Sequence, residues 1–496
     1  MKRISLYLAA CLLLTVSCSK EPKNPTTCTD ACIYPDYTDI TVPSNIAPVN
    51  FIIQDPAHKY LTILESGILK VKISGKKVCI PMRKWRQLMA QGNITVTVFE
   101  KKENGWNRMK PFHINIADEI DSYLTYRIIP PLFESYQKLS INQRDLTSFK
   151  EKVVYSNSMI SKGTTTQCIN CHSFKNWHTD YMQFHIRQYL GGTIMYTNGK
   201  LEKLNLKTDS TISAAVYPSW HPTHDYLAYS TNKTFQNIHT NHTNRIEVFD
   251  EVSDLILYNY TDHSVSIIEN DSTEFECYPS WAPDGKTLYY VSAYTGNPSD
   301  FKKKGGAAVA NANATFKYSL YSKGFDPDKR LWERKQMFYD AAAVDSSITW
   351  PRVSPDGRWL LCCISTHGVF PPNQEVSDLI IFDLVNGTHR YVDEINSKKS
   401  ESYHSWSSNG KWVVISSRRE DGVHTRLYLS HLNNDGTFTK PFPLPQKDPE
   451  FSNKFMYSFN IPEFTVEPVK VSPRVLASFI KSTDAAHVSY EPKIGE

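Results

Sequence analysis

One short pattern recurs four times in the second half of the chain, and it constrains the fold more strongly than any other feature of the sequence. Each copy ends a strand-like run on an anchor residue, passes through a turn, and begins an alternating strand-like run. Three of the copies have Asp-Gly or Asn-Gly at the turn, because Gly, Asn and Asp accept positive φ at low cost. The anchors are Trp220, Trp281, Val353 and Trp406, which are 53 to 72 residues apart.

This spacing predicts a β-propeller, because a four-stranded blade with loops of uneven length has about this size. We predict a mainly β fold with about six blades over residues 192–480, and a tail over residues 481–496. The alternative is a β-sandwich with repeated hairpins, which four copies in phase disfavour. The repeat resembles the WD-like repeat of the TolB-type propeller over about residues 193 to 480, although the first copy lacks the Asp-Gly turn and the third lacks the Trp anchor.

The N-terminus has the pattern of an exported lipoprotein. Lys2 and Arg3 precede the apolar run 4–16, which is too short to span a bilayer and is typical of a signal peptide. The run ends in small residues before Cys18, which resembles the lipobox where bacterial lipoproteins are diacylated. We therefore predict a signal peptide over residues 1–17 and a lipid anchor on Cys18, in the outer membrane on its periplasmic or surface face. The alternative is an ordinary cleaved signal with an incidental Cys.

Three regions separate this N-terminus from the repeat. Residues 18–45 are rich in Pro, Thr and charge, which predicts a tether. Residues 46–117 alternate in short strand-like runs, which predicts a β-sandwich similar in pattern to a fibronectin type III domain, with Trp85 as a core anchor. In residues 118–191 apolar residues recur at three- and four-residue steps up to a Gly-Gly pair, which predicts a mostly helical segment.

The helical segment contains the one motif in the sequence that points to chemistry. Cys168, Cys171 and His172 have the CxxCH spacing at which c-type haem is attached. The two thiols add across the haem vinyl groups, and the adjacent His then binds the iron axially. An exported chain also meets haem in the right compartment. We therefore predict one haem c, held by these three residues.

Three other interpretations of the Cys pair are open. A Cys168–Cys171 disulfide is compatible with an exported protein. A thioredoxin-like redox pair is disfavoured because no βαβ pattern surrounds it. A zinc site needs two further ligands, and the sequence has no second Cys pair and no His pair at finger spacing. Strand-like contexts predict that four other cysteines are small buried side chains: Cys79, Cys277, Cys362 and Cys363.

The sixth iron ligand is predicted on a short helix from Thr179 to Leu190. Met182 and His185 are three residues apart and would share one face of that helix. We favour His185 as the ligand, with Met182 second. A vacant or water-bound position is the alternative.

The rest of the sequence excludes several classes of function. The net charge of +4 is small and spread along the chain, so no nucleic-acid partner is predicted. The sequence has no Gly-x-Ser-x-Gly elbow, phosphate loop, dinucleotide fingerprint or His-Glu-x-x-His motif, and no hydrolase, kinase or dehydrogenase is predicted. The enzyme alternative is a haem enzyme such as a peroxidase, which would need an open distal site.

The order of these parts resembles a group of bacterial TolB-like lipoproteins that combine a CxxCH segment with a propeller. The phrases that carry the resemblance lie at 168–174, 182–187 and 191–193. The favoured hypothesis is a cell-envelope redox protein that transfers electrons or senses redox state, with the propeller docking an envelope protein or redox partner. The alternative is a haem-free propeller that binds a protein or glycan, with the Cys pair as a disulfide.

Overall fold

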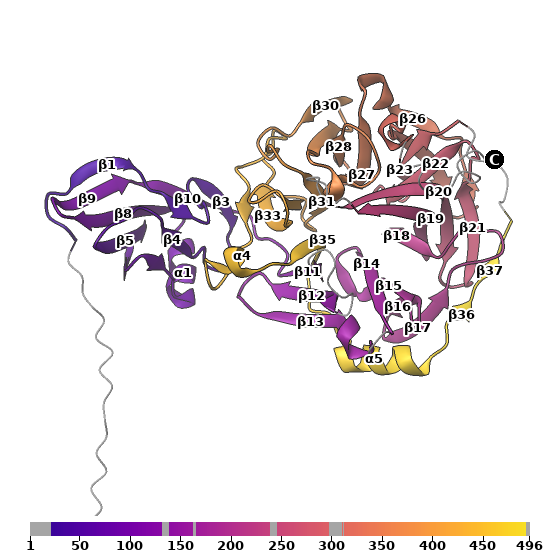
Figure 1. Cartoon of the computed structure of the whole chain (residues 1–496), viewed down its shortest axis with the longest axis horizontal. Helices are drawn as coiled ribbons and strands as arrows, with labels where there is room; N and C mark the ends of the chain where they lie inside the picture. The colour runs from indigo at the N-terminus through magenta and orange to yellow at the C-terminus, as the bar shows by residue number, and fades with distance from the viewer. Residues whose placement is uncertain are drawn as a thin grey trace, which may run out of the picture.

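The computed structural model describes residues 21–130, 138–161, 165–238, 246–296, 310 and 312–492, and within them it is mainly β-strand. A small N-terminal β-domain lies beside a larger ring of sheets (Figure 1). The predicted signal peptide 1–17 and Cys18 lie outside the described residues. In the described part of the chain, no helix has both the length and the apolar composition needed to cross a membrane.

The larger body is a propeller-type ring of six antiparallel sheets in the described residues (Figure 1). Each sheet is built outward from one inner strand, and each inner strand contacts the next around the ring. The first sheet contains β14 (Gln167–Lys175), β15 (His178–Gln188), β16 (Gly192–Thr197) and β17 (Lys200–Asn205). The second sheet contains β18 (Ala215–Trp220), β19 (Tyr226–Ile238), β20 (Ile246–Asn259) and β21 (Ser264–Glu269). The third sheet contains β22 (Glu274–Trp281), β23 (Thr287–Tyr294), β24 (Ser319–Asp326), β25 (Leu331–Trp332) and β26 (Gln336–Tyr339). The next two are β27 (Ser347–Val353), β28 (Trp359–Ser365), β29 (Asp378–Asp383) and β30 (Thr388–Tyr391); and β31 (Glu401–Trp406), β32 (Trp412–Ser417), β33 (Arg426–His431) and β34 (Phe442–Pro443).

The sixth sheet closes the ring with strands from both ends of this body. The inner strand β35 (Ser458–Thr465) comes from the C-terminal part, and the outer strands are β11 (Tyr123–Ile129), β12 (Ser140–Asp145) and β13 (Glu151–Ser156). β11 and β35 pair antiparallel, with Leu124 opposite Phe464. The ring is therefore held shut by backbone hydrogen bonds between segments more than 300 residues apart.

The predicted helical segment 118–191 is wrong, because β11 to β15 occupy its described residues. In β15 the side chains of Met182, Phe184 and Ile186 are buried in one core cluster, which is the two-residue period of a strand. β15 is hydrogen-bonded to β14 on one side and to β16 on the other. This pairing outweighs the helix-like spacing of the apolar residues. Gly192, with φ +147, is the first residue of β16, opposite Ile186 in β15, and does not end a helix.

The N-terminal domain begins earlier than predicted. The predicted tether 18–45 is wrong from Thr26 onward, since three strands and the buried Tyr37 lie in that stretch. One sheet contains β1 (Thr26–Asp30), β3 (Ile40–Pro43), β5 (Lys59–Ser66), β6 (Leu69–Ser74), β8 (Ile94–Lys102), β9 (Gly105–Lys110) and β10 (Phe112–Ala117), and the other contains β2 (Ile33–Tyr34), β4 (Phe51–Ile53) and β7 (Lys77–Val78). The pairs β1–β9 and β3–β10 are parallel, which departs from the antiparallel sheets of a fibronectin type III domain.

Trp85 is a core anchor, as predicted, but it lies on a helix. Helix α1 (Met82–Met89) buries Trp85, Leu88 and Met89 on one face, and the Trp85 indole N–H donates to the Ile46 carbonyl at 2.8 Å. The same core cluster continues into the propeller through Trp412, which is fully buried. The two bodies therefore share one hydrophobic core.

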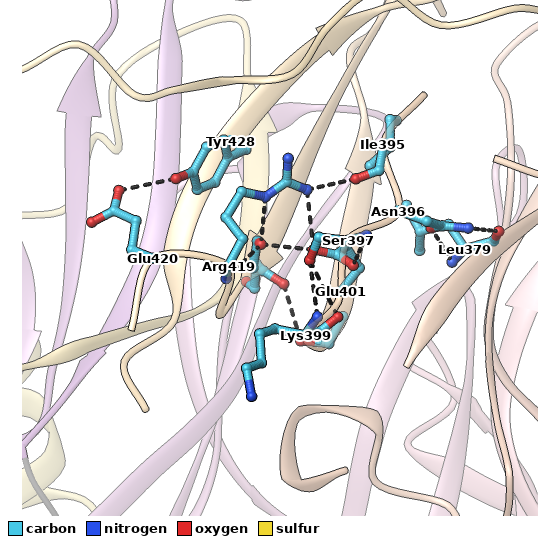
Figure 2. Close-up of polar contacts among 12 residues, drawn as sticks. Leu379, Ile395, Asn396, Ser397, Lys399, Glu401, Arg419, Glu420 and Tyr428 are labelled. Carbon is cyan, nitrogen blue, oxygen red and sulfur yellow. Dashed lines mark hydrogen bonds and ion pairs between the residues drawn. The ribbon is translucent and has the colours of Figure 1, made fainter. Parts of the chain in front are cut away.

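A buried polar network joins two neighbouring sheets of the ring (Figure 2). Glu401 at the start of β31 is fully buried, and the Arg419 guanidinium contacts its carboxylate at 3.0 Å. Arg419 also donates to the Ile395 carbonyl at 2.6 Å and to the Ser417 hydroxyl at 2.8 Å. The network compensates the carboxylate for its loss of water.

The C-terminal segment lies along the outside of the ring. Helix α5 (Pro473–Ser482) begins at Ser472, whose hydroxyl accepts from the Val475 N–H, and it buries Leu476 and Ile480. The predicted tail 481–496 then adds two short parallel strands to the outer edges of β17 and β21, namely β36 (Ala486–His487) and β37 (Ser489–Tyr490). Residues 493–496 lie outside the described residues.

Candidate functional site

Each of the six inner strands carries one bulged residue with positive φ. At each of these positions the strand register shifts, so that an extra residue is left unpaired and its side chain is redirected. The aromatic rings from four different sheets meet there; the Tyr217 and Tyr278 centroids are 4.6 Å apart. The six residues, named here the axial plug, are Cys171 (φ 54), Tyr217 (φ 52), Tyr278 (φ 53), Trp350 (φ 54), Tyr403 (φ 34) and Ile461 (φ 47).

The CxxCH motif is therefore one copy of the propeller repeat. Cys171-His172-Ser173-Phe174 in β14 occupies the place that Tyr217-Pro218-Ser219-Trp220 occupies in β18. The segment 461–464 in β35 is the sixth copy. The repeat was not recognised in these two segments of the sequence, because Cys and Ile replace the aromatic residue at the first position. A Pro or His followed by a polar residue and an aromatic residue is the signal that would have found them.

The axial plug is uneven. Trp350 contacts Tyr403 with ring centroids 4.5 Å apart and Tyr278 at 5.0 Å, so the aromatic side is filled. Cys171 and Ile461 are the two small members, and they lie on adjacent inner strands. A small pocket opens beside them, with a cavity volume of about 20 Å³. This axial pocket is lined by Cys171, His172, Ser173, Tyr217, Pro218, Tyr278, Pro279, Trp350, Pro351, Arg352, Ile461 and Glu463.

His172 is the most unusual polar residue of the axial pocket. It is 2% exposed, and neither ring nitrogen has a partner in good hydrogen-bond geometry among the described residues, although the backbone of Thr125 and Ile461 lies close to the ring. Burial lowers the pKa of His172 to about 3. The backbone of Thr125 and Ile461 favours the charged form of the ring, but this effect is smaller than the effect of burial. The neutral imidazole therefore has one donor and one acceptor. His404 holds the same position in β31, and its Nε2 bonds to the Leu361 carbonyl at 2.8 Å.

One ion pair lines the pocket two residues beyond the plug. Arg352 Nη2 is 2.9 Å from Glu463 Oε1, and the Ser405 hydroxyl donates to the other carboxylate oxygen at 3.4 Å. The Arg352 guanidinium lies over the Trp350 ring, 5.1 Å from its centroid. Burial raises the pKa of the Glu463 carboxyl, and the contacts with Arg352 and Ser405 oppose this rise.

A second buried carboxyl interacts with the aromatic side of the plug. Asp250 accepts from the Asn232 amide at 2.8 Å, and burial raises its pKa from 3.8 to about 7. Because the folded state favours the protonated form, the stability from this group is complete below about pH 4 and is lost as the pH rises to about 7.

We expect Asp250→Asn to remove this pH dependence. The variant should gain stability relative to the wild-type chain as the pH rises from 4.5 to 8, since the amide cannot ionise. Urea unfolding of both proteins at pH 4.5, 6 and 8 measures the difference. If the free energy of unfolding changed with pH in the same way for both proteins, Asp250 would not be the group that causes the pH dependence.

The predicted haem residues lie on two paired strands, β14 and β15, with His185 opposite Asn170, but their side chains have different surroundings. Cys168 is half-buried against the core cluster that contains Met182, whereas Cys171 lines the axial pocket, and both thiols are free. His185 bonds to the Thr193 hydroxyl through Nδ1 at 3.1 Å. The prediction that Met182 and His185 share a helix face is wrong, because residues three apart on a strand point to opposite faces.

This arrangement does not fit a haem, because the two thiols and the two proposed iron ligands lie in different environments. The haem itself stays a prediction. Among the described residues, no group of three His, Cys, Asp or Glu side chains could hold a metal ion. Of the other cysteines, Cys277, Cys362 and Cys363 are buried, as predicted, whereas Cys79 is exposed.

Comparisons with known proteins were made on the sequence and on the fold. No family model and no curated protein matches the chain. The fold is similar to TolB from Acinetobacter baumannii, with 13% identity over 77% of this chain and 85% of that one and a TM-score of 0.42. It is also similar to a Synechocystis apocarotenoid oxygenase, with 11% identity over 86% and 95% and a TM-score of 0.36. None of these similarities assigns a function, and the propeller-type fold rests on the sheet order itself.

Proposed function

We propose that the chain is a haem-free binding module of the cell envelope, with the axial pocket as its ligand site. The observation that carries the proposal is His172, an unpartnered and almost fully buried imidazole that lines a pocket in an otherwise filled plug. A buried polar group left without a partner costs about 1–3 kcal/mol, and a ligand that bonds to it recovers that free energy. The resemblance of the sequence before Cys18 to a lipobox supports an anchored location at the envelope.

The proposal predicts that filling the pocket abolishes binding. Cys171→Tyr introduces the residue that three other inner strands carry at this position, so the bulge accepts it and the pocket closes. A thermal-shift screen of a defined library of small envelope metabolites should give compounds that stabilise the wild-type chain and not Cys171→Tyr. Cys171→Ser is the control, since it keeps the volume and should keep the hits. A screen in which no compound distinguishes the variants would contradict the axial site.

A haem-carrying redox protein is the second candidate, and the CxxCH spacing supports it. The separated environments of Cys168 and Cys171 oppose it. We therefore expect protein expressed with haem-maturation factors to have the intact mass of the haem-free chain and no thioether-type α-band in its pyridine haemochrome spectrum. An α-band and a mass gain of one haem, both lost in a Cys168→Ala, Cys171→Ala variant, would establish the cytochrome and reject the haem-free module.

A further inference from the structure

We infer that the outer face of the larger N-terminal sheet rests on an anionic phospholipid surface, next to the lipid on Cys18. The inference rests on the envelope location in the proposed function and adds the surface that this domain contacts there. It follows from three features: the basic side chains on that face, the place where the chain leaves the sheet, and the short stretch of chain from there to Cys18.

The register of the strands places six basic side chains on one face of the larger N-terminal sheet. Residues directly opposite in neighbouring antiparallel strands share a face, and so do residues two apart along a strand. Lys72 in β6 is opposite Ile63 in β5. Arg108 in β9 is opposite Phe99 in β8, and Phe99 is opposite Leu61 in β5. This face, named here the basic face, carries six exposed side chains: Lys59, Lys70, Lys72, Lys101, Arg108 and Lys110.

The basic face has an excess of positive charge. β5, β6, β8 and β9 place one carboxylate on it, Glu65, which contacts Lys70 at 2.9 Å. The segment before β1 and the end of β1 add Glu21, 2.8 Å from Lys70, and Asp30, 3.4 Å from Lys110. The other side of the same strands is packed in the core cluster that the two bodies share. The basic face therefore points away from the core, where a partner can approach it.

The chain leaves the N-terminal domain from the basic face. β1 pairs with β9 from Thr26 onward, whereas Glu21, five residues earlier, contacts Lys70 on β6. β8 and β5 lie between β9 and β6 in the sheet, so the intervening segment crosses the basic face. Cys18 is three residues before Glu21, and three residues span at most about 11 Å. A lipid on Cys18 therefore holds this face at the membrane surface.

Phospholipid headgroups supply the complementary charge. Exposed Lys and Arg side chains are attracted to anionic lipids over roughly one Debye length, about 8 Å at physiological salt. A lipid chain and a basic patch together hold a protein more firmly than the lipid chain alone. The apolar centre of the face is already covered, since Leu61, Ile63 and Phe99 are 2% exposed or less. The contact is therefore electrostatic, and salt weakens it.

Co-sedimentation with vesicles tests the inference on the mature chain, residues 18–496 with Cys18→Ser, which has no lipid. We expect about tenfold tighter binding to phosphatidylcholine vesicles that contain about 30% phosphatidylglycerol than to phosphatidylcholine alone, and loss of this difference at high salt. The basic-face variant, which combines Lys72→Gln, Lys101→Gln and Arg108→Gln, should bind the anionic vesicles about tenfold more weakly. The matched control removes three exposed positive charges from the propeller and should bind as the parent chain does: Lys207→Gln, Lys286→Gln and Lys398→Gln.

The lipidated wild-type chain in the same vesicles gives a second measurement. β6 is an edge strand that pairs with β5 alone in the described residues, and it carries Lys70 and Lys72. Its amide hydrogens should exchange about threefold more slowly with phosphatidylglycerol in the vesicles than without it. Exchange in β30, an outer strand of the propeller, should be the same in both.

Equal binding to the two kinds of vesicle, or a basic-face variant that binds as tightly as its control, would overturn the inference. Retention on heparin that the basic-face variant loses, without vesicle binding, would overturn it in favour of an acidic polysaccharide. These outcomes are separate from those of the proposed function. Cys171→Tyr closes the axial pocket and should leave vesicle binding unchanged, whereas an exported wild-type chain whose intact mass includes no acyl group would contradict the lipid anchor itself.

Discussion

Replacing Arg419 with Met is expected to lower the free energy of unfolding by about 3–5 kcal/mol, because it leaves a buried carboxylate without its cation. Glu401 is fully buried, and Arg419 is its only ion-pair partner among the described residues. Arg419 Cζ also lies 4.5 Å from the centroid of the Tyr428 ring (Figure 2). The Met side chain keeps part of the aliphatic packing of Arg419 but carries no charge. Urea unfolding at neutral pH measures the loss.

Two further variants separate the charge effect from a general loss of packing. Adding Glu401→Gln to Arg419→Met should recover part of the stability, since a neutral amide is less costly to bury than an unpaired carboxylate. Lys329→Met is the exposed control; Lys329 is 3.0 Å from Asp326 on the surface, and its loss should leave the free energy of unfolding almost unchanged. If Arg419→Met were as stable as the exposed control, the network would not stabilise the ring.

Trp412→Ala is expected to lower the free energy of unfolding by about 3–5 kcal/mol and to loosen the contact between the two bodies. Trp412 is fully buried in the core cluster that both bodies share, and its indole N–H donates to the Asp118 carbonyl at 3.0 Å. The His431 ring lies against it, with centroids 4.8 Å apart. Removing the indole leaves a cavity at the junction, which nearby backbone fills only in part.

The junction should also become accessible to protease. Limited proteolysis of Trp412→Ala is expected to cleave near residues 118–122 and to release the N-terminal domain, and thermal unfolding should separate into two transitions. Trp412→Phe is the control, because it keeps most of the packing and loses only the hydrogen bond to Asp118, so its loss should be smaller. A single sharp transition for Trp412→Ala, with no new cleavage, would show that the two bodies do not depend on this contact.

Local patterns predicted most of the ring correctly. The turn residues and the alternation after each anchor depend on neighbours within a few residues, so the copies at Trp220, Trp281 and Trp406 identify blades from sequence. The burial of Cys277, Cys362 and Cys363 followed from their strand-like contexts in the same way. The prediction of a helical segment over residues 118–191 failed. Apolar residues three and four apart also occur in strands, and here neighbouring strands pair with this segment to form sheets.

By itself the sequence determined the propeller repeat, since the repeat depends on residues close together in the chain, whereas the export pattern at the N-terminus stays a prediction. The tertiary structure decided the role of the CxxCH motif. Cys171 and His172 belong to a plug whose six members extend from position 171 to position 461, and a bulge in each inner strand turns them toward one axis. Which residues are small enough to leave a pocket there, and which imidazole is left without a partner, depends on contacts between strands far apart in the chain. No local spacing records those contacts, because the backbone hydrogen bonds that create them form only when the ring closes.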